Sequence, residues 1–108
     1  QESVGCMIKT DTIRNRDYLN FSYLFMKIEK DIHQNTHIRT QGRYLCAWHK
    51  GSYDTIHKTY EHMLEYANKH GITIGPYAYE EYLIADIAQK DYTQYVTYIR
   101  MDVIDEAI

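Results

Sequence analysis

The chain has 108 residues, of which 44% are hydrophobic and 25% are charged, and its formal net charge is −3. This size suits one small domain over residues 1–108, and the slightly acidic balance excludes the basic footprint of a nucleic-acid-binding protein. Tyrosine is the unusual count, with 12 residues against 2 phenylalanines and 1 tryptophan. Because tyrosine combines an apolar ring with a polar hydroxyl, this excess is typical of recognition surfaces, although a tyrosine-rich core would give the same count.

The first 42 residues contain two predicted strands and two polar segments. Residues 4–9 form a short apolar run and predict a strand, and the polar residues 11–17 predict a connection. Residues 21–29 fit both a helical stripe and an alternating strand, and their aromatic content favours the strand. Residues 35–42 are polar and predict a turn.

Residues 43–49 alternate as a β-strand does. One face carries a tyrosine, a cysteine and a tryptophan: Tyr44, Cys46 and Trp48. Alternation does not say which face meets the core, so Tyr44 and Trp48 are either walls of a pocket or core residues, and we favour the pocket. Cys46, on a strand that we expect to be buried, is predicted to be inert.

The strongest element is an amphipathic helix over about residues 53–70. Ser52 is a suitable N-cap, Asp54 lies in the first turn, and Gly71 follows at the C′ position. Apolar residues recur at helical spacing: Ile56, Tyr60, Met63, Leu64 and Ala67. This stripe predicts a helix that covers one face of a sheet.

After the helix, Gly75-Pro76 predicts a turn, and two more strands follow over residues 79–85 and 95–103, joined by a polar segment over residues 86–93. The last strand alternates between two sets: Ile99, Met101 and Val103 on one face, and Tyr98, Arg100 and Asp102 on the other. The order β-α-β-β predicts an α+β domain with an antiparallel sheet and one long amphipathic helix.

Two carboxylates, Glu80 and Glu81, interrupt a run that is otherwise aromatic, β-branched or apolar. A carboxylate on such a strand is costly to bury without a partner, and an acid ringed by aromatic side chains suits a flat organic cation. Alternation places Glu80 and Tyr82 on one face and Glu81 on the other. The alternative is a Glu80 that is solvated or paired with Arg100.

The two cysteines, Cys6 and Cys46, are far apart and belong to no CxxC motif. A secreted domain of this size usually carries more, so we expect free thiols in a reducing compartment. Residues 4–8 are too short an apolar run for a signal peptide, and no run is long enough to cross a bilayer. We therefore expect a soluble, cytoplasmic protein without membrane contact.

Five segments stand in order along the chain: His49-Lys50-Gly51-Ser52-Tyr53, Tyr60, Gly75-Pro76, Tyr79-Glu80-Glu81-Tyr82-Leu83-Ile84, and residues 95–103. Together they resemble the C-terminal half of the GyrI-like effector-binding domain, which is the ligand-sensing part of multidrug-binding transcription activators of the MerR class and of some AraC-class regulators. The resemblance is good over residues 43–103 and loose over residues 4–29. In the family the last strand often reads Thr-Glu-Ile, whereas this chain has Tyr98 in place of that glutamate.

The resemblance implies a pseudo-duplicated domain of which this chain lacks the opening β-α of the first half. It implies that the sheet face away from the helix lines the ligand cavity, and that Glu80 is the acid of that cavity. The expected ligand is a lipophilic or aromatic small molecule that carries a positive charge. The expected ligand-binding residues are Glu80, Glu81, Tyr82, Tyr98, Trp48, Tyr44 and Tyr53.

The sequence therefore predicts an effector-binding domain of a drug-responsive transcriptional regulator, with no cofactor and no direct contact with DNA. A DNA-binding domain and a homodimer partner are expected in the full-length regulator. No metal is expected, because the histidine pairs His33/His37 and His57/His62 lack a supporting cysteine cluster. Two alternatives stay open: a hydrolase of strained electrophilic natural products with Glu80 as general base, and a protein-interaction module. We expect that this domain is not an enzyme.

Overall fold

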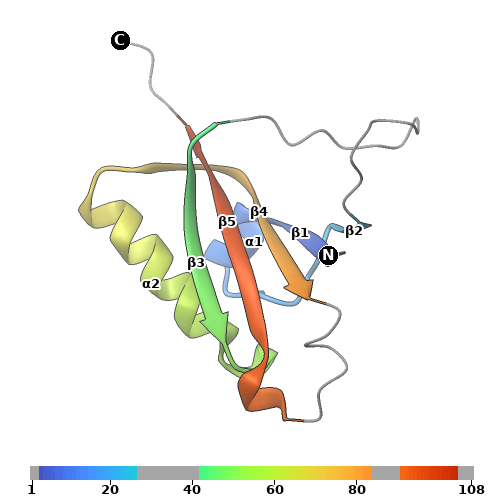
Figure 1. Ribbon diagram of the computed structural model, residues 1–108. Helices are drawn as coiled ribbons and strands as arrows, with labels where there is room; N and C mark the ends of the chain where they lie inside the picture. The colour runs from blue at the N-terminus through green and yellow to red at the C-terminus, as the bar shows by residue number, and fades with distance from the viewer. Residues whose placement is uncertain (1–2, 27–41, 84–90, 105–108) are drawn as a thin grey trace, which may run out of the picture.

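The computed structural model describes residues 3–26, 42–83 and 91–104. Five strands form one antiparallel sheet in the order β2 (Tyr23–Met26), β1 (Ser3–Lys9), β4 (Thr73–Leu83), β5 (Val96–Ile104) and β3 (Tyr44–Lys50). The long helix α2 (Ile56–Lys69) lies along one face of this sheet (Figure 1). The predicted α+β class, with one long helix on an antiparallel sheet, is confirmed.

Helix α2 follows from the apolar stripe read in the sequence. Its predicted first turn is a separate 3₁₀ turn, η1 (Tyr53–Thr55). The buried residues of α2 are four members of the stripe: Ile56, Tyr60, Met63 and Ala67. Gly71 takes a φ of +66° just after the helix, as the predicted C′ residue should. Ser52 precedes η1, but its side chain makes no capping hydrogen bond, so the predicted capping role is wrong.

Two segments that we predicted to be irregular have regular structure. A short helix, α1 (Thr10–Arg14), occupies the start of the expected connection over residues 11–17 and buries Ile13. Gly75-Pro76 does not form a turn but lies within β4, where the register with β5 shifts between Ile74 and Ala78. A bulge accommodates proline because the regular ladder of backbone hydrogen bonds is interrupted there.

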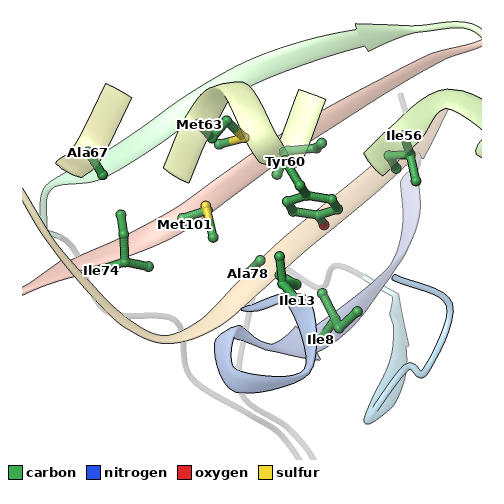
Figure 2. Packing of buried hydrophobic residues seen from close by; sticks show 10 residues of the cluster. Ile8, Ile13, Ile56, Tyr60, Met63, Ala67, Ile74, Ala78 and Met101 are labelled. Atoms are coloured by element: carbon green, nitrogen blue, oxygen red, sulfur yellow. The ribbon is translucent and has the colours of Figure 1, made fainter. Parts of the chain in front are cut away.

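The apolar core lies between the sheet and the two helices, on the same face for both (Figure 2). Strands β1, β4 and β5 contribute Ile8, Ala78 and Met101, and α1 contributes Ile13. The remaining members are Ile56, Tyr60, Met63, Ala67, Ile74 and Ile99. This layer defines a helix face of the sheet, and we call the opposite side the open face.

Side-chain burial confirms the alternation predicted for the last strand. In β5, Ile99 and Met101 are buried in the core, whereas Tyr98 and Arg100 are partly exposed. In β3 the alternation also holds, but Cys46 is exposed on the open face, so its predicted burial is wrong. Both cysteines are free, as predicted.

Several predictions fall on residues outside the described ranges. They are residues 27–29 at the end of the strand predicted over 21–29, the histidines His33 and His37, most of the turn predicted over 35–42, and residues 84–90. Within the described ranges, no helix has the length and apolarity needed to span a bilayer.

Candidate functional site

Glu80 lies on the helix face of β4 and is fully buried, with 0% of its surface exposed. Strand pairing sets it opposite Cys6 of β1 and Ile99 of β5. A carboxylate at such a position has lost its hydration shell, so its stability depends on the hydrogen-bond donors around it.

Three uncharged side chains supply those donors. The hydroxyl of Tyr60 in α2 donates to Oε2 of Glu80, and Figure 2 shows the Tyr60 ring reaching from α2 toward the sheet. The hydroxyl of Tyr82 donates to Oε1 at 2.6 Å. The Cys6 thiol lies 3.6 Å from Oε1 and 3.1 Å from the Tyr82 hydroxyl oxygen. Within the described part of the chain, Glu80 forms no ion pair.

Burial dominates the electrostatics of this group. It raises the pKa of Glu80, while the hydrogen bonds from Tyr60, Tyr82 and Cys6 act in the opposite direction. Burial, followed by the negative charge of Glu80, raises the pKa of Tyr60, Tyr82 and Cys6. The phenols and the thiol therefore stay protonated and keep their role as donors to the carboxylate.

Aromatic rings surround the acid and its donors. Tyr53 meets the ring of Tyr82 edge-on, with 5.7 Å between ring centroids. Tyr18 stacks on Tyr60 at 5.9 Å, and Phe21 lies 6.3 Å from Tyr53. Tyr53 is 41% exposed and is the most exposed member of this group, in which Tyr18, Phe21 and Tyr82 are partly exposed. We call these seven residues the acidic aromatic cluster: Cys6, Tyr18, Phe21, Tyr53, Tyr60, Glu80 and Tyr82.

The other predicted site residues lie on the open face. Glu81 forms an ion pair with Arg100, with 3.3 Å between Oε1 and Nη1. Trp48 stacks on Tyr98 at 4.3 Å, and the Arg100 guanidinium lies 4.6 Å from the centroid of the Tyr98 ring. Trp48 is 66% exposed, and Tyr44 shares its side of β3.

The structure therefore divides the predicted site into two groups. Glu80, Tyr82 and Tyr53 come together on the helix face, whereas the other predicted residues are separated from them by the sheet: Glu81, Tyr98, Trp48 and Tyr44. The expectation that Glu80 lies on the sheet face away from the helix is wrong, because β4 and β5 align Glu80 with the core residue Ile99 and Glu81 with Tyr98. The alternative that pairs Glu80 with Arg100 is also wrong, since Glu81 takes that partner.

Sequence reasoning did not place Cys6, Tyr18, Phe21 or Tyr60 in the site. Tyr60 did give a signal: a tyrosine in the middle of a buried helical stripe must find a partner for its hydroxyl. Cys6 gave none, because its proximity to Glu80 follows from pairing between strands that are 74 residues apart at this point.

A shallow cleft with a volume of about 470 Å³ lies elsewhere, between α1 and the bulge of β4. Lys9, Arg14 and Tyr77 are among its lining residues, and none belongs to the acidic aromatic cluster. Its charged side chains are exposed to water. The cluster is the better candidate, because a buried acid with no ion-pair partner among residues 3–26, 42–83 and 91–104 is the more unusual feature.

Comparison with known proteins gives two matches. Residues 15–103 match the family described as the GyrI-like small molecule binding domain. The chain is also 27% identical, over 90 residues, to the multidrug-efflux transporter 2 regulator of Bacillus subtilis (strain 168), a stretch that covers 82% of this chain and 32% of that protein. The chain thus spans about a third of the length of this curated relative. No solved structure gave a significant match.

Proposed function

The chain belongs to the family of GyrI-like small-molecule binding domains, and we propose that it binds lipophilic aromatic cations as the effector domain of a transcriptional regulator. Family membership confirms the resemblance seen in the sequence. The observation that carries the proposal is the carboxylate of Glu80, which is fully buried, is held by two phenols and a thiol, and forms no ion pair with any residue that the structure describes.

Uncharged donors stabilise a buried carboxylate without neutralising it. A ligand that brings a positive charge to this cluster gains a Coulomb attraction that water does not screen, and a neutral analogue does not. The surrounding rings add cation–π attraction and apolar contact area for a flat ligand. The exposed ring of Tyr53 is the entrance, and entry requires Tyr82 to yield part of its contact with Glu80.

The curated relative supports the regulatory part of the proposal, since its name describes a regulator of a multidrug-efflux transporter. We place this domain in a longer regulator of the MerR class, in which a DNA-binding domain and a homodimer partner read the occupancy of the effector site. Such a regulator works beside DNA, so the proposal places it in the cytoplasm.

We place the domain among binding proteins rather than enzymes. As a general base Glu80 would have to accept a proton from a water molecule, but its two oxygens already accept hydrogen bonds from Tyr60 and Tyr82. Covalent catalysis would instead need an activated nucleophile. The thiol of Cys6 is the soft nucleophile in the cluster, and burial raises its pKa, which keeps it protonated and unreactive.

Isothermal titration calorimetry tests the proposal with rhodamine 6G and tetraphenylphosphonium, and with triphenylphosphine oxide as a neutral analogue of the latter. Glu80→Gln removes the buried charge at nearly constant volume, and Glu81→Gln is the matched control at the next position. We expect saturable binding of both cations, weakened about tenfold or more by Glu80→Gln and less than about twofold by Glu81→Gln.

The proposal fails if neither cation binds the folded protein, or if Glu81→Gln weakens binding and Glu80→Gln does not. Mass spectrometry of the recovered ligand completes the test. Unchanged ligand supports a binding domain, whereas hydrolysed ligand moves the assignment to an enzyme.

A further inference from the structure

His49, near the end of β3, is 4% exposed and uses both of its ring nitrogens. Its Nδ1 lies 2.7 Å from the hydroxyl oxygen of Thr59 in α2. Its Nε2 lies 3.0 Å from the carbonyl oxygen of Ser52 and 3.2 Å from the hydroxyl oxygen of Thr55. One imidazole thus joins β3 to the turn that precedes α2 and to α2 itself.

The chemistry of the partners fixes the roles of the two nitrogens. A carbonyl oxygen only accepts, so Nε2 carries a proton and donates it to Ser52. In the neutral imidazole Nδ1 then accepts from the Thr59 hydroxyl. The Thr55 hydroxyl also lies 3.3 Å from the Ser52 carbonyl and reinforces the same point of the turn.

This turn carries Tyr53, the entrance ring of the acidic aromatic cluster. The 3₁₀ turn Tyr53–Thr55 begins directly after Ser52, whose carbonyl His49 holds. In the sheet, His49 pairs with Thr97, and Thr97 pairs with Tyr82 on the next strand. His49 therefore lies on the same cross-strand row as Tyr82, the residue whose ring Tyr53 contacts.

The backbone of the turn is held from its other side as well. Gly51 has a φ of +126°, which side-chain-bearing residues rarely adopt, and its N–H donates to the Tyr95 carbonyl at 2.7 Å. A Cβ at Gly51 would come within 3.3 Å of the Thr55 hydroxyl oxygen. The turn is thus fixed at Gly51 by Tyr95, which directly precedes β5, and at Ser52 by His49, which leaves the backbone of Tyr53 little freedom to move.

We propose that His49 is a positioning residue that holds Tyr53 against Tyr82 and so sets the affinity of the site for aromatic cations. The part concerning affinity rests on the proposed function. The part concerning the position of Tyr53 is independent of any ligand. His49 acts through the turn, because its ring nitrogens are occupied by Ser52, Thr55 and Thr59.

Two substitutions at His49 separate the contacts of Nδ1 from those of Nε2. In His49→Gln the side-chain amide reaches the former place of Nε2, so an N–H remains to donate to Ser52. In His49→Asn the amide reaches only the former place of Nδ1, which preserves the bond to Thr59 and loses the bond to Ser52. His49→Gln loses the contact with Thr59, and His49→Asn loses the contacts with Ser52 and Thr55. A merely structural role predicts lower stability in both variants but no selective loss of the contacts between Tyr53 and Tyr82.

Nuclear Overhauser contacts between the rings of Tyr53 and Tyr82 test the positioning in the ligand-free 108-residue protein, where the ring centroids lie 5.7 Å apart. We expect the contacts to persist in His49→Gln and to disappear in His49→Asn. Contacts that survive in both folded variants overturn the inference.

Fluorescence anisotropy of rhodamine 6G tests the consequence for affinity. We expect affinity to fall about fivefold in His49→Asn, the factor for one hydrogen bond, and less than about twofold in His49→Gln. Equal affinities in the two variants overturn the inference. If the wild-type protein does not bind the dye, the proposed function fails, and the ring contacts alone decide the role of His49.

A matched pair of threonines keeps the test decisive if His49→Asn does not fold. Thr55→Val removes the hydroxyl on the turn side of His49, and Thr59→Val removes the hydroxyl on the helix side. Both residues are half-buried, so the two changes are alike in volume and environment. We expect Thr55→Val to weaken the Tyr53–Tyr82 contacts and dye binding, and Thr59→Val to leave both unchanged. The reverse order overturns the inference.

Discussion

Glu80 and Glu81 are neighbours in β4, yet the sheet places the first under α2 and the second on the open face. Glu80 is surrounded by phenols and a thiol that cannot cancel its charge. Glu81 lies 3.3 Å from the guanidinium of Arg100, which supplies a full positive charge. The same residue type, one position apart, thus has two opposite electrostatic environments.

The difference shows where a ligand can contribute. An added cation finds no uncompensated charge at Glu81, because Arg100 already occupies that role. At Glu80 the buried charge opposes folding, and a cation that enters removes this opposition. A site that lowers stability until its ligand arrives is a common trade between function and stability. Substitutions on each face and changes of pH distinguish these two environments.

The largest expected effect is the difference in stability between two variants that each lose a tyrosine, one on the helix face and one on the open face. Tyr60 is 0% exposed and packs between α2 and the sheet, so Tyr60→Ala should lower the free energy of unfolding by about 3–5 kcal/mol. Tyr98→Ala, on the open face, should lower it by about 1 kcal/mol, mainly through the lost stacking on Trp48. Urea denaturation followed by circular dichroism measures both. Equal losses would show that Tyr98 is packed as tightly as Tyr60 in solution.

Breaking the ion pair of the open face should have the next largest effect. Arg100→Leu removes the guanidinium that lies 3.3 Å from Glu81, a side chain that is 9% exposed, and should lower the free energy of unfolding by about 1–2 kcal/mol, between the values for surface and buried pairs. The double variant with Glu81→Gln should recover most of this loss. Binding of rhodamine 6G should stay within about twofold of wild type, since the pair faces away from the cluster. A loss of dye binding would place the ligand on the open face.

Alternation in the sequence predicted the two faces within each strand but not the match between strands. Glu80 with Tyr82, and Tyr44 with Trp48, were correctly paired by the two-residue period of a strand. Whether these two pairs share a face depends on the register of β4 against β5 and of β5 against β3. Local pattern carries no information on that register, so the sequence could not show that Glu80 and Trp48 lie on opposite faces of the sheet.

The helix was predictable because its signals are local. The stripe from Ile56 to Ala67 and Gly71 together fix its face and its end. The strand bulge at Gly75-Pro76 was not predictable, since the same dipeptide is a frequent turn and only pairing with β5 continues the strand. Cys6 was missed for a similar reason, because its neighbour Glu80 arrives from the other end of the chain.

The third prediction concerns pH. Burial raises the pKa of Glu80, and only the ionised carboxylate attracts a cation, so affinity should fall as pH falls through this raised pKa, by at most about tenfold per pH unit. Calorimetric titrations of tetraphenylphosphonium across the acidic range measure the slope. Glu80→Gln should abolish the slope. A slope that persists in Glu80→Gln would show that Glu80 is not the group whose charge attracts the cation.

Stability should depend on pH with the opposite sign. Because the pKa of Glu80 is higher in the folded than in the unfolded state, its protonated form favours folding. That contribution is fully present below the unfolded pKa and is lost as pH rises through the folded pKa. The free energy of unfolding of wild type should therefore decrease relative to Glu80→Gln over this interval, and urea titrations at several pH values follow the difference.

The smallest expected effect is at Trp48, and it is the sharpest test of the two faces. Trp48 is 66% exposed and packs on Tyr98, so Trp48→Phe should lower the free energy of unfolding by less than about 1 kcal/mol and leave dye affinity unchanged. Trp48 is also the one tryptophan of the chain, and its emission reports on the open face. A ligand bound beside Glu80 has the sheet between itself and the indole, so saturating tetraphenylphosphonium should quench Trp48 little while calorimetry records full binding. Strong saturable quenching with the same midpoint would instead mean that the cation stacks on Trp48 and that Glu80 is a structural acid of the core.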